Sequence, residues 1–138
     1  MAPATAPVLL GLKSTAQGGM HEKLLAGLPF KTLTTFLDTS GLEPKDVYAV
    51  MQLPARTLAR RKVAGKLTTE ESEHLLRLAD LYRQTLELFN GNADAARGWL
   101  AEKRPALGGY RPIDLARTTT GTKVVADLIF KLEYGIIV

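Results

Sequence analysis

The 138-residue chain contains no cysteine, and this absence excludes disulfides, thiolate catalysis and zinc sites with cysteine ligands. It fits a reducing compartment, so we expect a cytoplasmic protein. Histidine is also scarce, because the two histidines, His21 and His74, lie far apart and have no ligand-like neighbours. We therefore expect no metal site, no catalytic residue and no cofactor, and the sequence does not indicate an enzyme.

Long apolar runs are missing as well. No stretch approaches the ~20 residues that cross a bilayer, and residues 1–20 lack the cationic start of a signal peptide. We expect no membrane association. The Ala, Pro, Gly and Thr content of residues 1–19 instead predicts a flexible amino-terminal arm.

What the chain does contain is helical patterning. Apolar residues recur at helical spacing, and Pro and Gly stand where helices start and stop, so we predict an all-α fold without strand-like alternation. The length allows one domain, or two small ones that share a core. The expected helices cover residues 21–28, 30–39, a short segment from Pro44, a segment opened by Pro54, 69–89, 93–102, 112–116 and a last segment stopped by Gly135.

The longest expected helix begins with a capping box, Thr68-Thr69-Glu70-Glu71, in which Thr68 and Glu71 each satisfy a backbone N–H group of the other. A helix that is apolar on two sides is buried on two sides, so this one either crosses the centre of the fold or forms a dimer contact. Its two apolar stripes are Leu75, Leu78, Tyr82, Leu86 and Phe89, and Leu76, Leu81 and Leu88.

The most informative segment is 44–69, which reads as a short helix, a tight turn and a second helix with a cationic outer face. Between Pro54 and Lys66 every charged residue is Lys or Arg. Leu58 and Val63 are expected to face inward. A second helix of this kind is how helix-turn-helix proteins enter the major groove of DNA.

The alternative for this segment is a solvated charged face with no partner. The helix-turn-helix spacing and the absence of balancing carboxylates favour DNA contact. Position along the helix suggests Arg56, Thr57 and Arg60 for base edges, and Arg61, Lys62 and Lys66 for phosphates.

The chain ends on three β-branched apolar residues, Ile136, Ile137 and Val138. Terminal residues are normally frayed and tolerate polar groups. Such a terminus should therefore either seal the protein's own core or a homodimer seam, or bury itself in a partner. Composition alone does not choose between these alternatives.

Taken together, these residues resemble the Xre/MbcA/ParS antitoxins of bacterial type II toxin–antitoxin pairs. The stretch LPARTLARRK…GKLTTEESEHLLRLADL, residues 53–81, looks like the family's Xre-type DNA-binding half. Residues 95–136 are similar to its carboxy-terminal domain, with Trp-Leu, Leu-Gly-Gly, Pro-Ile-Asp-Leu, Thr-Gly and Tyr-Gly landmarks in order. The match runs from about Leu28 to the end and leaves the amino-terminal arm outside the pattern.

The resemblance implies an antitoxin that neutralises a RES-domain toxin, which consumes NAD⁺, and that usually represses its own operon. It implies an arm over residues 1–19, an Xre-like helix-turn-helix domain over 20–89 and a toxin-binding domain over 90–138. In the family, the end of that last domain reaches the mouth of the toxin's active site. Carried onto this sequence, the toxin contact maps to Lys131, Glu133, Tyr134, Gly135, Ile136, Ile137 and Val138.

The expected partners are a RES-domain toxin, operator DNA and a second copy of the chain. Operators of helix-turn-helix proteins are usually palindromic, so we expect a homodimer or a higher even oligomer, with helix 69–89 as the candidate seam. Two alternatives remain open. One is a stand-alone repressor whose tail is only core, and the other is a partner-inhibiting module that has lost DNA binding.

Overall fold

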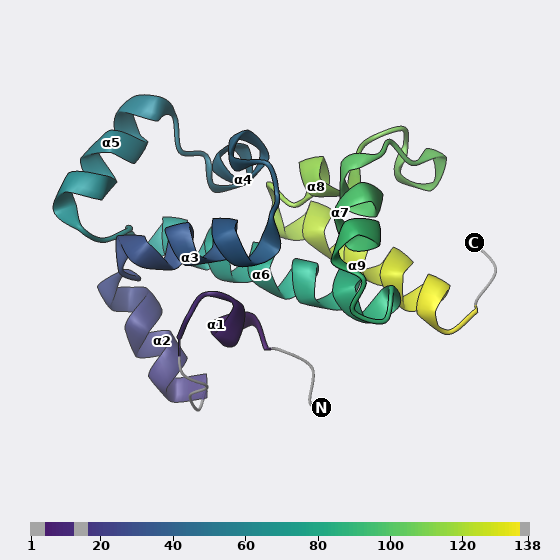
Figure 1. The fold of residues 1–138 in the computed structure, drawn as a ribbon, viewed down its shortest axis with the longest axis horizontal. Coiled ribbons are helices and arrows are strands. Elements are labelled where there is room, and N and C mark those ends of the chain that lie inside the picture. The colour runs from purple at the N-terminus through teal and green to yellow at the C-terminus, as the bar shows by residue number, and fades with distance from the viewer. Residues whose placement is uncertain (1–4, 13–16, 136–138) are drawn as a thin grey trace.

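The computed structural model describes residues 5–12 and 17–135, and these residues form helices and loops without any β-strand (Figure 1). An isolated β-bridge joins Pro29 to Lys66. The predicted all-α class is confirmed. In chain order the elements are α1 (Ala6–Leu9), α2 (Gln17–Ala26), α3 (Phe30–Ser40), α4 (Pro44–Met51), α5 (Ala55–Ala64), α6 (Thr69–Leu88), α7 (Ala93–Ala101), the 3₁₀ helix η1 (Pro105–Leu107), α8 (Pro112–Leu115) and α9 (Thr119–Glu133).

Helix α6 is the axis of the molecule. Its 20 residues span about 30 Å, and it packs against α1 to α4 in the first half of the chain and against α7 and α9 in the second. The prediction that it crosses the centre of the fold is confirmed. Both apolar stripes pack within the same chain, so they no longer argue for a dimer seam. Their buried members are Leu75, Leu78, Leu81 and Tyr82, and their half-buried members are Leu76, Leu86, Leu88 and Phe89.

The predicted capping box starts this axial helix. The Thr68 hydroxyl accepts from the Glu71 N–H at 3.1 Å, and the Glu71 carboxylate accepts from the Thr68 N–H at 2.9 Å. Each of two otherwise unpaired donors at the helix start therefore has a partner. Local sequence therefore accounts for the capping of α6.

The flexible arm predicted over residues 1–19 is wrong for residues 5–12. Thr5 caps α1 through its hydroxyl, which accepts from the Val8 N–H at 3.4 Å. Leu9 and Leu10 are buried, and α1 packs against α3 and α6. A proline is tolerated in the first turn of a helix, so composition did not prevent folding, and burial of the two leucines supplies the stabilisation.

Val63, which was expected to face inward, is exposed, and so are two apolar side chains of α9. Val63 is 91% exposed because it lies five residues after Leu58, on the opposite side of α5, and Leu58 is the residue of that helix that packs partly against the core. Val124 is 45% exposed because it flanks the buried side of α9. Leu132 continues the buried stripe but is 41% exposed in the last turn of the helix. The buried side consists of Gly121, Val125, Leu128 and Ile129.

An ion cluster joins the two halves of the chain. Arg111, before α8, donates to both carboxylate oxygens of Asp46 in α4 at 3.0 and 3.3 Å. The same guanidinium donates to both oxygens of Asp114 at 2.7 and 3.0 Å. Arg111 thus binds two carboxylates, and this gives the Asp of the Pro-Ile-Asp-Leu landmark a structural role. The buried apolar residues of both halves form one continuous cluster.

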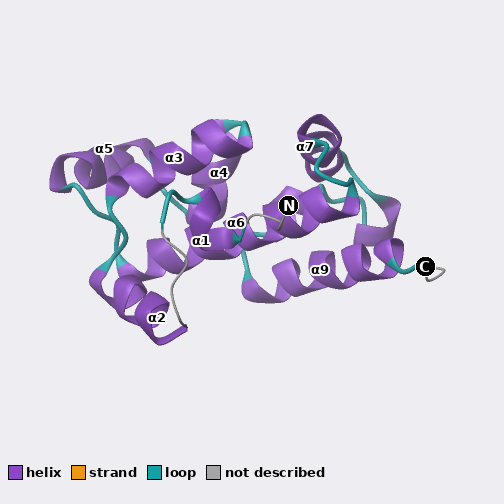
Figure 2. Ribbon diagram, turned by 60° about the horizontal axis from the view of Figure 1, so that its bottom comes forward, coloured by secondary structure: helices purple, strands orange, loops and turns teal. Residues whose placement is uncertain are grey.

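The molecule is elongated, and its two regions of interest lie at opposite ends. Figure 1 places α5 at one end of the long axis and the carboxy-terminal end of α9 at the other. Figure 2, turned by 60°, shows the same separation. Helix α6 runs between them.

Candidate DNA-binding and toxin-binding sites

Helix α5 follows α4 through the tight turn that the sequence predicts. Gln52 ends α4 in the left-handed region at φ 56°, and the Leu53 N–H donates back to the Tyr48 carbonyl at 2.9 Å. Pro54 then precedes α5 with extended backbone, and Gly65 ends the helix at φ 80°. A left-handed residue after the last helical turn is the usual helix stop. Two short helices joined in this way form the helix-turn-helix unit.

Helix α5 and the residues just after it carry unpaired cations. Arg56, Arg60, Lys62 and Lys66 are exposed, and in the described ranges no carboxylate lies within salt-bridge distance of any of them. The Thr57 hydroxyl accepts from the Arg60 guanidinium at 3.4 Å. Four free cations beside a hydroxyl suit a polyanion, because phosphate contacts supply most of non-specific DNA affinity.

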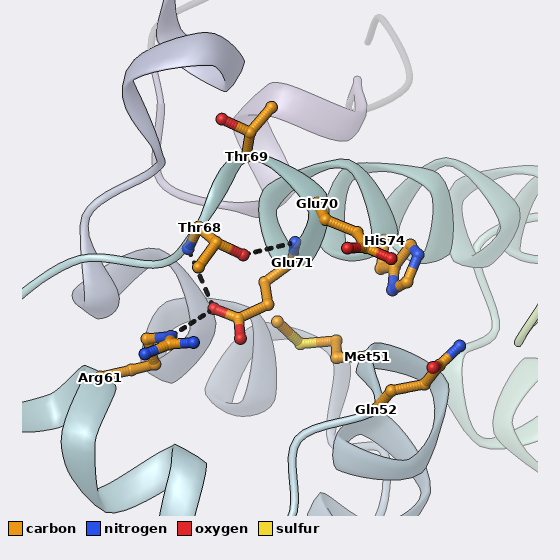
Figure 3. Close-up of a pocket in the computed structure, with 8 residues that line it drawn as sticks. All are labelled: Met51, Gln52, Arg61, Thr68, Thr69, Glu70, Glu71 and His74. Carbon is orange, nitrogen blue, oxygen red and sulfur yellow. Dashed lines mark hydrogen bonds and ion pairs between the residues drawn. The ribbon is translucent and has the colours of Figure 1, made fainter.

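Arg61 is placed differently from the other cations of the segment. Its Nε donates to Glu71 Oε1 at 2.8 Å, and its side chain is 24% exposed (Figure 3). This hydrogen bond raises the pKa of Arg61. Burial raises the pKa of the Glu71 carboxyl, but hydrogen bonds from Arg61 and from Thr68 outweigh it, so this pKa lies below its ordinary value. Both groups are therefore charged near neutral pH.

The pair borders an open cavity of about 470 Å³ between the α4–α5 turn, α5 and the start of α6. Figure 3 shows Met51 and Gln52 on one side of it, and Glu70 and His74 on the other. In the described part of the chain, no three His, Cys, Asp or Glu residues gather closely enough to hold a metal ion.

The second candidate site is the carboxy-terminal end of α9. Four of the predicted toxin-binding residues, Lys131, Glu133, Tyr134 and Gly135, are exposed there. Gly135 adopts φ 67°, so the chain turns away from the helix axis at this residue. The other three predicted residues, Ile136, Ile137 and Val138, lie outside the described residues.

Phe130 joins this surface, although the sequence interpretation did not include it. Phe130 is 55% exposed and Tyr134 is 67% exposed, and their ring centroids lie 4.6 Å apart. They are four residues apart and so share one face of α9, opposite the buried Val125, Leu128 and Ile129. That position is readable from helical periodicity, because an aromatic residue opposite the apolar stripe must point outward.

The described helices include none that is both long enough and apolar enough to span a membrane.

Comparison with known families gives two matches, one in each half of the chain. Residues 19–80 match the "Antitoxin Xre-like helix-turn-helix domain", and residues 84–135 match the "Antitoxin Xre/MbcA/ParS C-terminal toxin-binding domain". The chain belongs to the Xre/MbcA/ParS antitoxin family. It is an antitoxin of a toxin–antitoxin system, with a DNA-binding helix-turn-helix domain and a domain for a toxin partner.

Curated relatives agree with this assignment. The chain is 27% identical to "Antitoxin Xre" of Yersinia enterocolitica over 92% of its own length and 86% of that protein. It is 27% identical to "Antitoxin Xre" of Photorhabdus laumondii over 93% of its length and 87% of that protein. It is also 29% identical to "Prs ADP-ribosylating antitoxin" of Sphingobium sp., over 79% of its length and 74% of that protein.

Two consequences follow for the sequence interpretation. The families and relatives are antitoxins and not enzymes, as predicted. Alignments that cover more than nine-tenths of the chain must include part of residues 1–19, which the sequence interpretation placed outside the family pattern. The similarity therefore begins no later than about residue 12, inside the segment predicted as an arm.

Proposed function

We propose that this antitoxin neutralises a RES-domain toxin that degrades NAD⁺, by blocking its active site with the carboxy-terminal tail, and that it represses its own operon through α5. The observation that carries the proposal is the separation of two exposed surfaces at opposite ends of one body (Figure 1). One is cationic and free of carboxylates, and the other is aromatic and leads into an apolar terminus. Both partners act in the cytoplasm.

On the toxin side, the tail would act as a plug. If Ile136, Ile137 and Val138 bury fully in the toxin, each contributes roughly 1.5–3 kcal/mol before ordering costs. The exposed Phe130 and Tyr134 extend the apolar contact back along α9. Occlusion of a cleft shaped for a dinucleotide inhibits by exclusion and needs no chemistry from the antitoxin.

The proposed reaction of the toxin is the consumption of NAD⁺, which can occur by hydrolysis or by transfer of ADP-ribose. The name of the Sphingobium relative, "Prs ADP-ribosylating antitoxin", refers to ADP-ribosylation of Prs. Hydrolysis of NAD⁺ and transfer of its ADP-ribose both break the bond to nicotinamide. An assay of NAD⁺ loss, run with and without an acceptor protein, therefore covers both reactions.

The plug is tested by co-expression with the toxin gene that neighbours the antitoxin gene. Deletion of residues 136–138 should release toxicity and restore NAD⁺ loss, while the circular dichroism of the antitoxin stays unchanged. The matched control replaces all three residues with Leu, which keeps the apolar bulk and should keep protection. Unchanged protection after the deletion would refute the plug.

The DNA-binding part is tested by a gel shift with the DNA upstream of the antitoxin gene. The double variant Arg56→Ala/Arg60→Ala should abolish the shift, and affinity should fall steeply with salt. The matched control is Lys103→Ala/Lys123→Ala, which removes the same charge from exposed sites in the carboxy-terminal half. Retained binding by the Arg56/Arg60 variant would show that another element contacts DNA.

The oligomeric proposal rests on operator symmetry. A palindromic operator pairs with a two-fold symmetric protein, so we expect a homodimer or a higher even oligomer on DNA. Light scattering of the free protein and of its operator complex measures this. A stand-alone repressor without a toxin is disfavoured by the match of residues 84–135 to a toxin-binding domain. A module without DNA binding is disfavoured by the free cations of α5.

A further inference from the structure

Helix α5 is attached to the body by very few apolar contacts. None of its ten residues is buried, and Leu58 alone packs partly against the core. After the helix, the Gly65 carbonyl accepts from the Phe30 N–H at 2.9 Å, and the Leu67 N–H donates to the Leu28 carbonyl at 2.8 Å. These bonds hold one end of the segment but leave the rotation and tilt of the helix to other contacts.

The bond between Arg61 and Glu71 supplies such a contact. Glu71 is only 8% exposed, and its Oε1 accepts from both the Arg61 Nε at 2.8 Å and the Thr68 N–H at 2.9 Å. The carboxylate is itself fixed, because Glu71 is the third residue of α6 and belongs to the capping box. Arg61 therefore ties α5 to the capped start of α6, the central helix of the molecule (Figure 3).

Helical geometry separates this tie from the DNA-facing residues. Arg61 is three residues from Leu58, so the two share the face that points to the body. Arg56 and Arg60 are four residues apart and share the opposite face. Both are exposed, and neither has a carboxylate partner among residues 5–12 and 17–135.

We propose that Arg61 is a positioning residue: its bond to Glu71 sets the angle at which α5 presents Arg56 and Arg60 to DNA, and Arg61 does not contact phosphate. This inference rests on the proposed DNA binding by α5. It differs from the assignment by position along the helix, which places Arg61 with Lys62 and Lys66 at the phosphates.

The substitution Glu71→Gln distinguishes phosphate contact from positioning, because the two roles of Arg61 predict opposite changes in operator affinity. Its amide oxygen still accepts from the Thr68 N–H, so the cap survives. It also raises the formal net charge of +4 by one unit, and it weakens the bond to Arg61, because a neutral amide oxygen replaces the carboxylate. If Arg61 contacts phosphate, operator binding becomes tighter. If Arg61 positions α5, binding becomes weaker despite the added charge, by about fivefold or more.

The experiment measures the dissociation constant of the upstream DNA across a salt series, for the full chain and for single variants. Lys62→Ala should weaken binding and reduce the slope of log K against log salt by about 0.9, as one phosphate contact requires. Arg61→Ala should weaken binding with an unchanged slope. Arg61→Ala/Glu71→Gln should bind as Arg61→Ala does, because both changes break the same bond.

Several outcomes overturn the inference. Operator binding by Glu71→Gln that is tighter than, or equal to, that of the parent would overturn it. A salt slope of Arg61→Ala that is reduced as much as that of Lys62→Ala would also overturn it. If Lys62→Ala and Arg56→Ala/Arg60→Ala both bind like the parent, α5 does not contact DNA, and the proposed function fails together with the inference. Circular dichroism and urea unfolding of each variant confirm that the compared proteins are folded.

Discussion

Replacement of Gly121 by Ala should destabilise the carboxy-terminal half, although alanine is the better helix former. Gly121 is buried in the first turn of α9, where an added Cβ would overlap the carbonyl oxygen of Leu115. It would also lie 3.0 Å from the Leu115 carbonyl carbon and 2.9 Å from Thr118 Oγ1. The nearest atom is a backbone oxygen, so no side-chain rotation relieves the main overlap.

The magnitude follows from two opposing effects. Alanine in a helix interior favours folding by about 1 kcal/mol over glycine. An added Cβ would lie about 1 Å too close to the Leu115 carbonyl oxygen, since ordinary contacts lie beyond about 3 Å, and the end of α8 and the start of α9 must separate by about 1 Å. Overpacking of this kind costs typically 1–3 kcal/mol and more against backbone. We expect a net loss of at least about 1 kcal/mol.

Gly98 in α7 is the matched control, because it is also a helical glycine of the carboxy-terminal half. A Cβ at Gly98 would have no atom within 4 Å. Gly98→Ala should therefore raise the free energy of unfolding by about 0.5–1 kcal/mol. Urea unfolding followed by circular dichroism at constant m-value measures both changes. Equal or greater stability of Gly121→Ala would refute the steric reasoning, and so would equal losses at the two sites.

Three further predictions concern the packing, the ion cluster and the outer face of α9. Leu10→Ala should lower the free energy of unfolding by about 2–4 kcal/mol, because this side chain is 1% exposed; no loss in the same urea assay would show that residues 5–12 do not contribute to the core. Hydrogen bonds from Arg111 hold the pKa of Asp114 below its ordinary value, so this carboxylate stabilises the fold above about pH 4 and the contribution is lost as pH falls through the folded pKa. Asp114→Asn should thus narrow the difference in urea midpoint between about pH 7 and about pH 3, and an unchanged difference would contradict this. Phe130→Ser and Tyr134→Ser should leave stability within about 0.5 kcal/mol yet weaken capture of the toxin in a pull-down, whereas unfolding would show that the pair is structural.

Local sequence chemistry predicted the features that depend on a few neighbouring residues. The capping box at Thr68 is one example, since its partners are three residues apart. The two-sided burial of α6 is another, because helical periodicity records it directly. The tight turn before Pro54 was also readable from residue types. In each case the deciding contacts are local.

The errors occurred where burial depends on how helices are arranged. Val63 is an exception, because it lies five residues after Leu58, about 140° around α5. Helical periodicity therefore already places it on the outer side, where it is 91% exposed. The first residues look flexible by composition, yet Leu9 and Leu10 fit against α6 and α3, which no local pattern reveals. Likewise, Glu71 was predicted as a cap, but its bond to Arg61 depends on the angle between α5 and α6. The tertiary arrangement decides these cases.

The arrangement around α6 also bears on how DNA and toxin share the chain. The first turn of α6 holds Glu71, which binds Arg61 of α5, and the remainder of the helix packs against α9. The two candidate sites share no residue and lie at opposite ends of the long axis (Figure 1). Geometry within one chain therefore imposes no competition between the two partners. If toxin binding changes operator affinity, that coupling must pass through α6, through the Asp46–Arg111 joint or through oligomerisation.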